Sequence, residues 1–199
     1  MKTPGVYIIE KNAFRNSVVE VATAIPAFIG HTQFARDGNK DLTGIPFRIS
    51  SMAEFHSFFG FAPTLRFGIR PEDSESEDTT NDINVLFPDG SCQLTLPKTF
   101  YALYYNMLLF YANGGGPCYI VSIGDYEHDF KSIDFTNALL ALKKEQEPTL
   151  VVVPEAVYME EGDCYKVQTA ALMHCGNDMK NRFAILDVFN GYKDENGAV

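Results

Sequence analysis

The chain contains 199 residues, of which 46% are hydrophobic and 21% are charged, and its formal net charge is −10. This composition is that of an ordinary globular protein, long enough for one domain whose core needs no disulfide or metal. Proteins that neutralise nucleic-acid phosphates usually carry a basic face, and this sequence has no cluster of lysine and arginine. The sequence therefore argues against nucleic acid as a partner.

Membrane insertion and export are also disfavoured. The strongly apolar runs, residues 107–112 and 150–153, are much shorter than the roughly 20 residues that cross a bilayer. The N-terminal sequence MKTPGVYIIE has no continuous apolar segment of the kind found in signal peptides. Because the four cysteines form no C-x-x-C pair, we expect reduced, buried thiols in a protein made in the cytoplasm, with a disulfide as the alternative.

The first predicted element is a strand that stands apart from the rest of the chain. Its side chains are β-branched or aromatic: Val6, Tyr7, Ile8 and Ile9. The mostly polar residues 11–17 separate this strand from the next apolar segment. We predict an extended N-terminal arm over residues 1–20 and a core domain over 21–199. Such an arm either folds back on its own sheet or adds a strand to a neighbouring molecule.

The core domain opens with a short buried strand at residues 27–30 and a short helix after Ser51. Ser51 and Glu54 form an S-x-x-E capping box, and Gly60 ends the helix. Residues 71–82, PEDSESEDTTND, then carry six acidic residues and no basic one. We predict an acidic, exposed surface loop there.

A β-hairpin and then alternating helices and strands follow the acidic segment. The hairpin spans residues 84–96, with a turn at Pro88-Asp89-Gly90. The predicted helices are 99–113, 135–144 and 165–179, and the predicted strands are 118–123, 150–153 and 183–188. Apolar strands between amphipathic helices indicate an α/β fold: a partly parallel sheet covered by helices, with the hairpin as an insertion.

No phosphate-binding or nucleophile motif occurs in the sequence. The triplet Gly114 to Gly116 follows a predicted helix and precedes a strand, which is the reverse of the order in a phosphate-binding loop. We therefore interpret these glycines as a helix stop. His174, Cys175 and Cys164 offer too few ligands in poor spacing for zinc. We expect no metal and no cofactor.

One catalytic alternative depends on two carboxylates. Glu155 and Asp187 come at the ends of two predicted strands, where α/β enzymes often place acids, bases or Mg²⁺ ligands. The sequence places no nucleophile or histidine beside them, so we expect no catalytic residues. A hydrolase or phosphotransferase that uses this pair is the alternative function.

Several segments resemble those of contractile tail sheath proteins, most closely the sheath subunits of phage-tail-like extracellular contractile injection systems. They are TPGVY (3–7), VATAIPAFIG (21–30), SMAEF (51–55), FG (59–60), FYANGGGPCYIV (110–121), KEQEP (144–148), VPE (153–155) and NRFAILD (181–187). No single segment is specific by itself. Their order and spacing over residues 3–191 carry the resemblance.

The resemblance implies a structural subunit and no enzyme. Sheath subunits polymerise around an inner tube and exchange strands through their arms, and contraction drives the tube through a target membrane without nucleotide hydrolysis. The implied partners are other sheath subunits, the inner tube protein, and baseplate and cap proteins. The particle would assemble in the cytoplasm and then be released from the cell.

The sequence departs from the family at its C-terminal end. Full-length sheath proteins continue beyond the segment that residues 183–188 match, with a part that completes the α/β core, faces the tube and ends in a second arm. The resemblance therefore implies that this chain is the N-terminal portion of a longer sheath fold. The tube contact is expected in the missing region, and the acidic loop 71–82 is expected to face outward.

Overall fold

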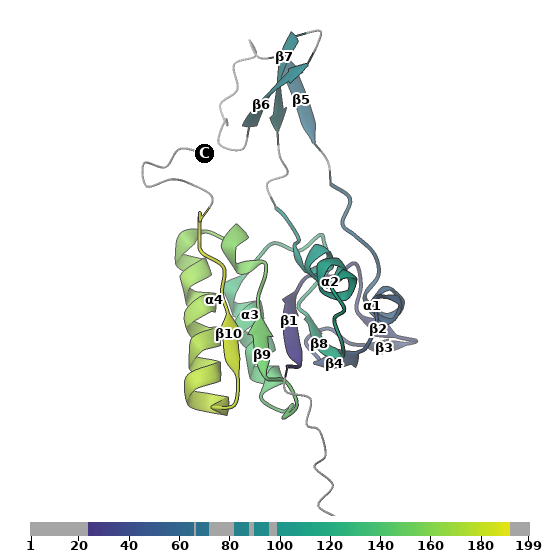
Figure 1. Ribbon diagram of the computed structural model, residues 1–199, viewed down its shortest axis with the longest axis vertical. Helices are drawn as coiled ribbons and strands as arrows, with labels where there is room; N and C mark the ends of the chain where they lie inside the picture. The colour runs from purple at the N-terminus through teal and green to yellow at the C-terminus, as the bar shows by residue number, and fades with distance from the viewer. Residues whose placement is uncertain (1–23, 66, 72–81, 88–89, 96–98, 192–199) are drawn as a thin grey trace, which may run out of the picture.

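A central sheet of five strands organises the molecule (Figure 1). The computed structural model describes residues 24–65, 67–71, 82–87, 90–95 and 99–191. In spatial order the strands are β10 (Phe183–Ile185), β9 (Leu150–Val152), β1 (Pro26–Gly30), β8 (Cys118–Ser122) and β4 (Phe47–Ile49). β4 pairs antiparallel with β8, and the other pairs are parallel. The predicted α/β fold with a partly parallel sheet is confirmed.

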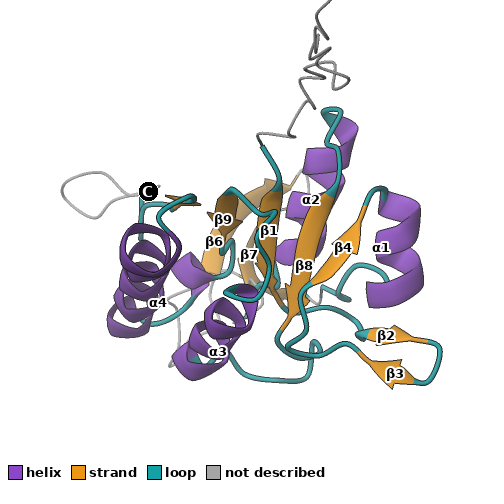
Figure 2. Ribbon diagram, turned by 90° about the horizontal axis from the view of Figure 1, so that it is seen from below, coloured by secondary structure: helices purple, strands orange, loops and turns teal. Residues whose placement is uncertain are grey.

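Helices cover both faces of this sheet (Figure 2). They are α1 (Met52–Phe59), α2 (Leu103–Ala112), α3 (Ser132–Leu142) and α4 (Glu161–Met173), with a 3₁₀ turn η1 (Ala156–Tyr158) and a π-helical turn η2 (His174–Met179). Helices α3 and α4 share one apolar cluster with the sheet, and α1 and α2 share the other. The predicted helix 165–179 begins earlier, at Glu161, and ends at Met179 as expected, but its last six residues form the π-helical turn η2.

The strand register explains why β1 and β8 read as continuous apolar runs. Ala27 aligns with Tyr119 and Val151, and all three face the α3–α4 cluster. Phe28 aligns with Ile120, and both face the α1–α2 cluster. Because successive side chains point to opposite faces and both faces are covered, every residue of these two strands is buried.

The ends of two helices confirm sequence predictions. The Ser51 Oγ accepts a hydrogen bond from the Glu54 N–H at 3.2 Å, which begins α1. The Glu54 carboxylate accepts from the Ser50 N–H rather than closing onto Ser51. Helix α2 ends at Ala112, and Gly114 then adopts a φ of 81°, which a residue with a side chain rarely takes. The glycine triplet is thus a helix stop.

The insertion is a three-stranded antiparallel sheet rather than a hairpin alone. Strands β6 (Asp82–Phe87) and β7 (Gly90–Thr95) form the predicted hairpin, and β5 (Gly68–Pro71), which the sequence analysis missed, pairs with the other edge of β7. Figure 1 shows this sheet projecting beyond the central sheet. Both ends of the acidic segment 71–82 lie in strands, so the predicted loop is narrower, and residues 72–81 lie outside the described residues.

The remaining described strands form a small antiparallel ribbon. Strands β2 (Arg36–Asp37) and β3 (Lys40–Asp41) pair with each other before β4. The predicted arm, residues 1–20 with Val6 to Ile9, lies outside the described residues, as do residues 192–199. Among the described helices, none has both the length and the apolar character that crossing a membrane requires.

The β10 edge of the central sheet is not covered by a described helix on the face that packs against α1 and α2. Phe183 and Ile185 of β10 align with Leu150 and Val152 of β9, and Val152 faces the α1–α2 cluster. Phe183 is 76% exposed and Ile185 is 50% exposed. Within the described residues this part of the sheet therefore presents apolar side chains to solvent.

Candidate functional site

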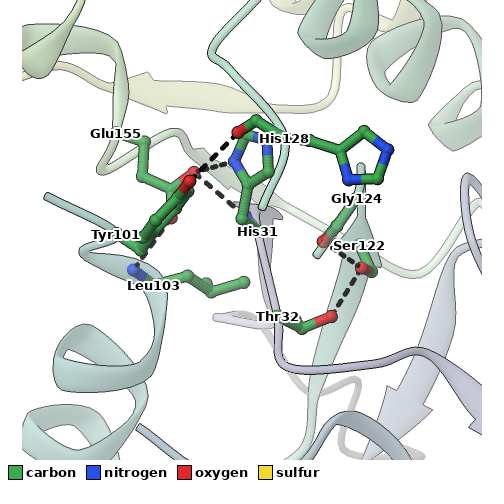
Figure 3. A network of polar contacts seen from close by, with 8 residues as sticks. All are labelled: His31, Thr32, Tyr101, Leu103, Ser122, Gly124, His128 and Glu155. Carbon is green, nitrogen blue, oxygen red and sulfur yellow. Dashed lines mark hydrogen bonds and ion pairs between the residues drawn. The ribbon is translucent and has the colours of Figure 1, made fainter. Parts of the chain in front are cut away.

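The carboxyl ends of β1 and β9 are where this topology would place a ligand. The chain leaves β1 through α1 and α2 toward β8 on one side, and it leaves β9 through α4 toward β10 on the other. Adjacent strands whose connections diverge in this way form a topological switch point, the usual binding crevice of open α/β sheets. In this protein the crevice is filled by a network of its own side chains (Figure 3).

A buried histidine–glutamate contact lies at the centre of this network. His31, directly after β1, is 1% exposed, and Glu155, after β9, is 0% exposed. The Glu155 Oε2 lies 2.7 Å from the His31 Nδ1 and accepts a second bond from the His31 backbone N–H at 3.0 Å. Its Oε1 accepts from the Leu103 N–H at 3.3 Å, at the start of α2. One carboxyl group therefore joins β1, β9 and α2.

The absence of a side chain at Gly30 makes room for this carboxyl group. A Cβ at Gly30 would lie 3.0 Å from both the Cδ and the Oε1 of Glu155 and 3.0 Å from the Leu103 Cβ. Contacts this short are tighter than almost all real Cβ contacts. The small residue at the end of β1 is thus a packing requirement of the buried carboxyl group.

A second group of contacts joins the ends of β1 and β8. The Thr32 and Ser122 hydroxyl oxygens are 2.6 Å apart. The Thr32 backbone N–H donates to the Gly124 carbonyl at 3.0 Å, and the Ser122 hydroxyl also lies 3.4 Å from that carbonyl. Both hydroxyl side chains are buried. They join the ends of β1 and β8 beside the crevice.

The outer part of the network is aromatic and only partly buried. The Tyr101 ring packs against His31 with centroids 5.3 Å apart, and its hydroxyl donates to the His128 carbonyl at 3.1 Å. Burial, followed by the charge of Glu155, raises the pKa of Tyr101. The His128 Nδ1 lies 2.6 Å from the Asp125 Oδ1. The Glu127 backbone N–H and then His128 lower the pKa of Asp125.

The structure places the two carboxylates of the alternative catalytic site in different surroundings. Glu155 is buried in the network, whereas Asp187 is exposed and its backbone carbonyl accepts a bond from the Gln168 Nε2 at 2.8 Å. The expectation that no histidine joins Glu155 was wrong, because His31 does. The two residues are 124 positions apart in the sequence, and no local spacing links them. Only their places after two strands could have suggested the contact.

The chemistry available at the network is limited by burial. A histidine held by a carboxylate can act as a general base when its other nitrogen reaches a substrate, but His31 is almost completely enclosed. Within the described ranges, no three or more His, Cys, Asp or Glu residues lie close enough together to hold a metal ion. The arrangement is suited to joining strand ends.

A shallow cavity of about 200 Å³ lies beside the loop after β8. Its lining residues are Thr43, Gly44, Ile123, Asp134, Asn137 and Ala138. Asp134 is the single titratable side chain among them. The cavity therefore lacks the pair of interacting titratable groups that would mark a catalytic pocket.

No protein-family model and no curated protein matches this chain.

Proposed function

We propose that the chain is a structural subunit of a contractile injection sheath. The observation that carries the proposal is where the sheath-like segments fall. Residues 21–30, 110–121, 153–155 and 181–187 contain or adjoin β1, β8, β9 and β10, which are consecutive members of one sheet. Segments scattered over the sequence thus converge on the core of one fold, as a resemblance based on common structure would require.

The proposed role follows from assembly. Subunits polymerise around an inner tube, and each moves from a less to a more favourable set of contacts when the sheath contracts. Residues 3–10, with Val6 to Ile9, donate a strand to another subunit. Baseplate and cap proteins contact the two ends of the polymer. The contact with the tube lies in the C-terminal part of the longer sheath fold. Assembly takes place in the cytoplasm before the particle is released.

The exposed apolar edge of the central sheet at β10 supports the proposal that further polypeptide chain completes this subunit. β10 pairs with β9 on one side, and Phe183 and Ile185 are largely exposed. An apolar sheet face left in water is unfavourable. Contact with further chain, from the longer sheath fold or from another subunit, would remove this apolar surface from water.

The proposal is tested by deleting residues 1–15. The described core begins at residue 24, so we expect the deletion to leave a folded monomer that no longer assembles into sheaths. Circular dichroism checks the fold, and electron microscopy of particles made with the tube, cap and baseplate proteins checks assembly. Sheaths of normal length and number from the deleted chain would contradict strand donation by the arm.

One observation favours a second candidate, a hydrolase or phosphotransferase. His31 and Glu155 pair at the switch point of the sheet, the place where α/β enzymes bind ligands. Against this candidate stands the enclosure of both side chains. A panel of ester and phosphate-ester substrates, tested with wild type and His31→Gln, separates the two: turnover that the substitution abolishes without unfolding the protein would support the enzyme.

A further inference from the structure

A buried arginine fastens the edge strand to the end of a helix. Arg182 lies directly before β10 and is 4% exposed. Its Nη1 donates to the Leu142 carbonyl at 3.1 Å, and its Nη2 donates to the Glu145 carbonyl. Leu142 is the last residue of α3, where carbonyls lack helical partners and the helix dipole favours a cation. Arg182 thus holds the start of β10 against α3.

The third partner of this arginine is a buried histidine. His174 is the first residue of η2, is 1% exposed, and places its Nε2 2.9 Å from the Arg182 Nη1. Because a guanidinium group only donates, the Nε2 must accept, which leaves the ring neutral with its proton on Nδ1. Burial, and then the charge of Arg182, lowers the pKa of His174 to about 4.

The charges around His174 oppose its protonation. Arg182 and Lys143 both disfavour the imidazolium, and Asp178 favours it. The Asp178 carboxylate is already paired with Lys143, at 2.7 Å from Nζ to Oδ2. Cys175, whose thiol pKa is raised by burial, and Glu145 act on Arg182 rather than on the ring. A proton on Nε2 would therefore face the arginine without an unpaired anion to balance it.

The element held by this contact is weakly attached. β10 has three residues, and among the described strands it pairs with β9 alone. Two of its three side chains, Phe183 and Ile185, are largely exposed. Separating a short edge strand with few buried side chains from its sheet costs less free energy than unfolding the central strands. β10 can thus leave the sheet while β1, β8 and β9 stay together.

We propose that His174 and Arg182 form an acid-sensitive latch that releases β10 from the sheet. When His174 takes up a proton, its Nε2 changes from an acceptor to a donor, and the contact with Arg182 is lost. The arginine then leaves the end of α3, and the strand that it precedes separates from β9. This latch is a property of the fold itself and does not depend on the proposed sheath function.

Proton binding by His174 is linked to the docking of β10 against β9 and α3, and this linkage gives the effect of pH on docking. While β10 is docked, His174 binds its proton with a pKa of about 4, against 6.5 for the free imidazole. Docking is therefore fully favoured above pH 6.5 and weakens as the pH falls toward 4. Between pH 7.5 and 5.5 the docking equilibrium constant should fall about tenfold. Both pH values lie above the isoelectric point of about 4.8, so the protein stays anionic.

Hydrogen exchange of individual backbone amides, detected by NMR, measures this release. Protection factors, corrected for the intrinsic effect of pH, should fall about tenfold in β10 between pH 7.5 and 5.5. Those of β1 should not change. His174→Gln keeps an acceptor for Arg182 but does not titrate, so its β10 protection should be independent of pH. His56→Gln, in α1, is the matched control and should behave as wild type.

The latch would be overturned by unchanged β10 protection in wild type, by an equal loss of β10 protection in His174→Gln, or by a parallel loss in β1 and β10 of wild type. A measurement on wild type alone decides the matter if the variant does not fold. The ¹⁵N shifts of His174 should place the proton on Nδ1 at pH 7.5, and a proton on Nε2 or a midpoint near 6.5 would contradict the proposal.

Discussion

Glu155 accepts hydrogen bonds from three different groups in the interior. Replacing it with alanine leaves the His31 ring nitrogen, the His31 N–H and the Leu103 N–H without their acceptor. Breaking a buried pair of this kind destabilises a protein by about 3 to 5 kcal/mol. We expect Glu155→Ala to lower the free energy of unfolding by that amount in urea denaturation. Asp187→Ala, at an exposed carboxylate, is the control and should change it by less than about 0.5 kcal/mol.

The same contact predicts the effect of adding one methyl group. Gly30→Ala would place a Cβ 3.0 Å from the Glu155 Cδ and Oε1. Overpacking a rigid interior costs about 1 to 3 kcal/mol, and urea denaturation should show a loss in this range. Gly116→Ala is the control, since a Cβ there has no atom within 4 Å. Equal stability of both variants would contradict the tight packing of the carboxyl group.

Thiol chemistry tests the burial of the cysteines. Cys118, Cys164 and Cys175 are buried and Cys92 is half-buried, and all four are free. Burial raises the pKa of the Cys118 thiol to about 11 and also raises the pKa of Cys164 and Cys175. At pH 8 we expect a thiol reagent to label Cys92 fastest and all four after denaturation. Fast labelling that survives Cys92→Ser would show that the core thiols are accessible.

At the scale of single residues, local patterns were predictable and distant contacts were not. Ser51 and Glu54 are three positions apart, so the Ser51 cap of α1 could be identified in the sequence. His31 and Glu155 meet only because β1 and β9 are neighbours in the sheet. Arg182 and His174 are eight positions apart, but their contact depends on the π-helical turn, for which the sequence gives no periodic signal.

At the scale of elements, apolar strands and amphipathic helices were predictable because burial fixes their patterns. The positions of β1, β8, β9 and β10 agree with the predicted strands to within a few residues. β5 was missed because Gly68 to Pro71 contains a glycine and a proline, both of which weaken a strand pattern. Its pairing with β7 is set by the hairpin, not by its own sequence.

The acidic segment should contribute little to stability. Pro71 and Asp82 lie in β5 and β6, so residues 72–81 can be replaced while both strands are kept. Because loop-closure entropy changes slowly with length, a short Gly-Ser link should change the free energy of unfolding by only about 1 kcal/mol. Thermal and urea denaturation measure this. A loss of several kcal/mol would show that the acidic residues make buried contacts.

At the scale of the whole molecule, we propose that function depends on assembly rather than on a catalytic site. The fold class could be read from the alternation of elements, whereas the role could not, because one α/β fold serves many functions. We predict that Glu155 and Asp187 take no part in contraction. We test this with a double variant that carries Glu155→Ala and Asp187→Ala. Because Glu155→Ala is destabilising, contraction of the double variant is measured only in particles that assemble. Such particles should contract in denaturant without added nucleotide or metal.

Electron microscopy can examine the proposed sheath function in the longer sheath fold that we propose contains this chain, produced together with candidate tube, cap and baseplate proteins. We predict helical sheaths that contain this chain, extended before treatment with denaturant and shortened after it, with no nucleotide present. A chain that stays dispersed beside bare tubes, or a sheath that shortens only when a nucleotide is hydrolysed, would contradict it.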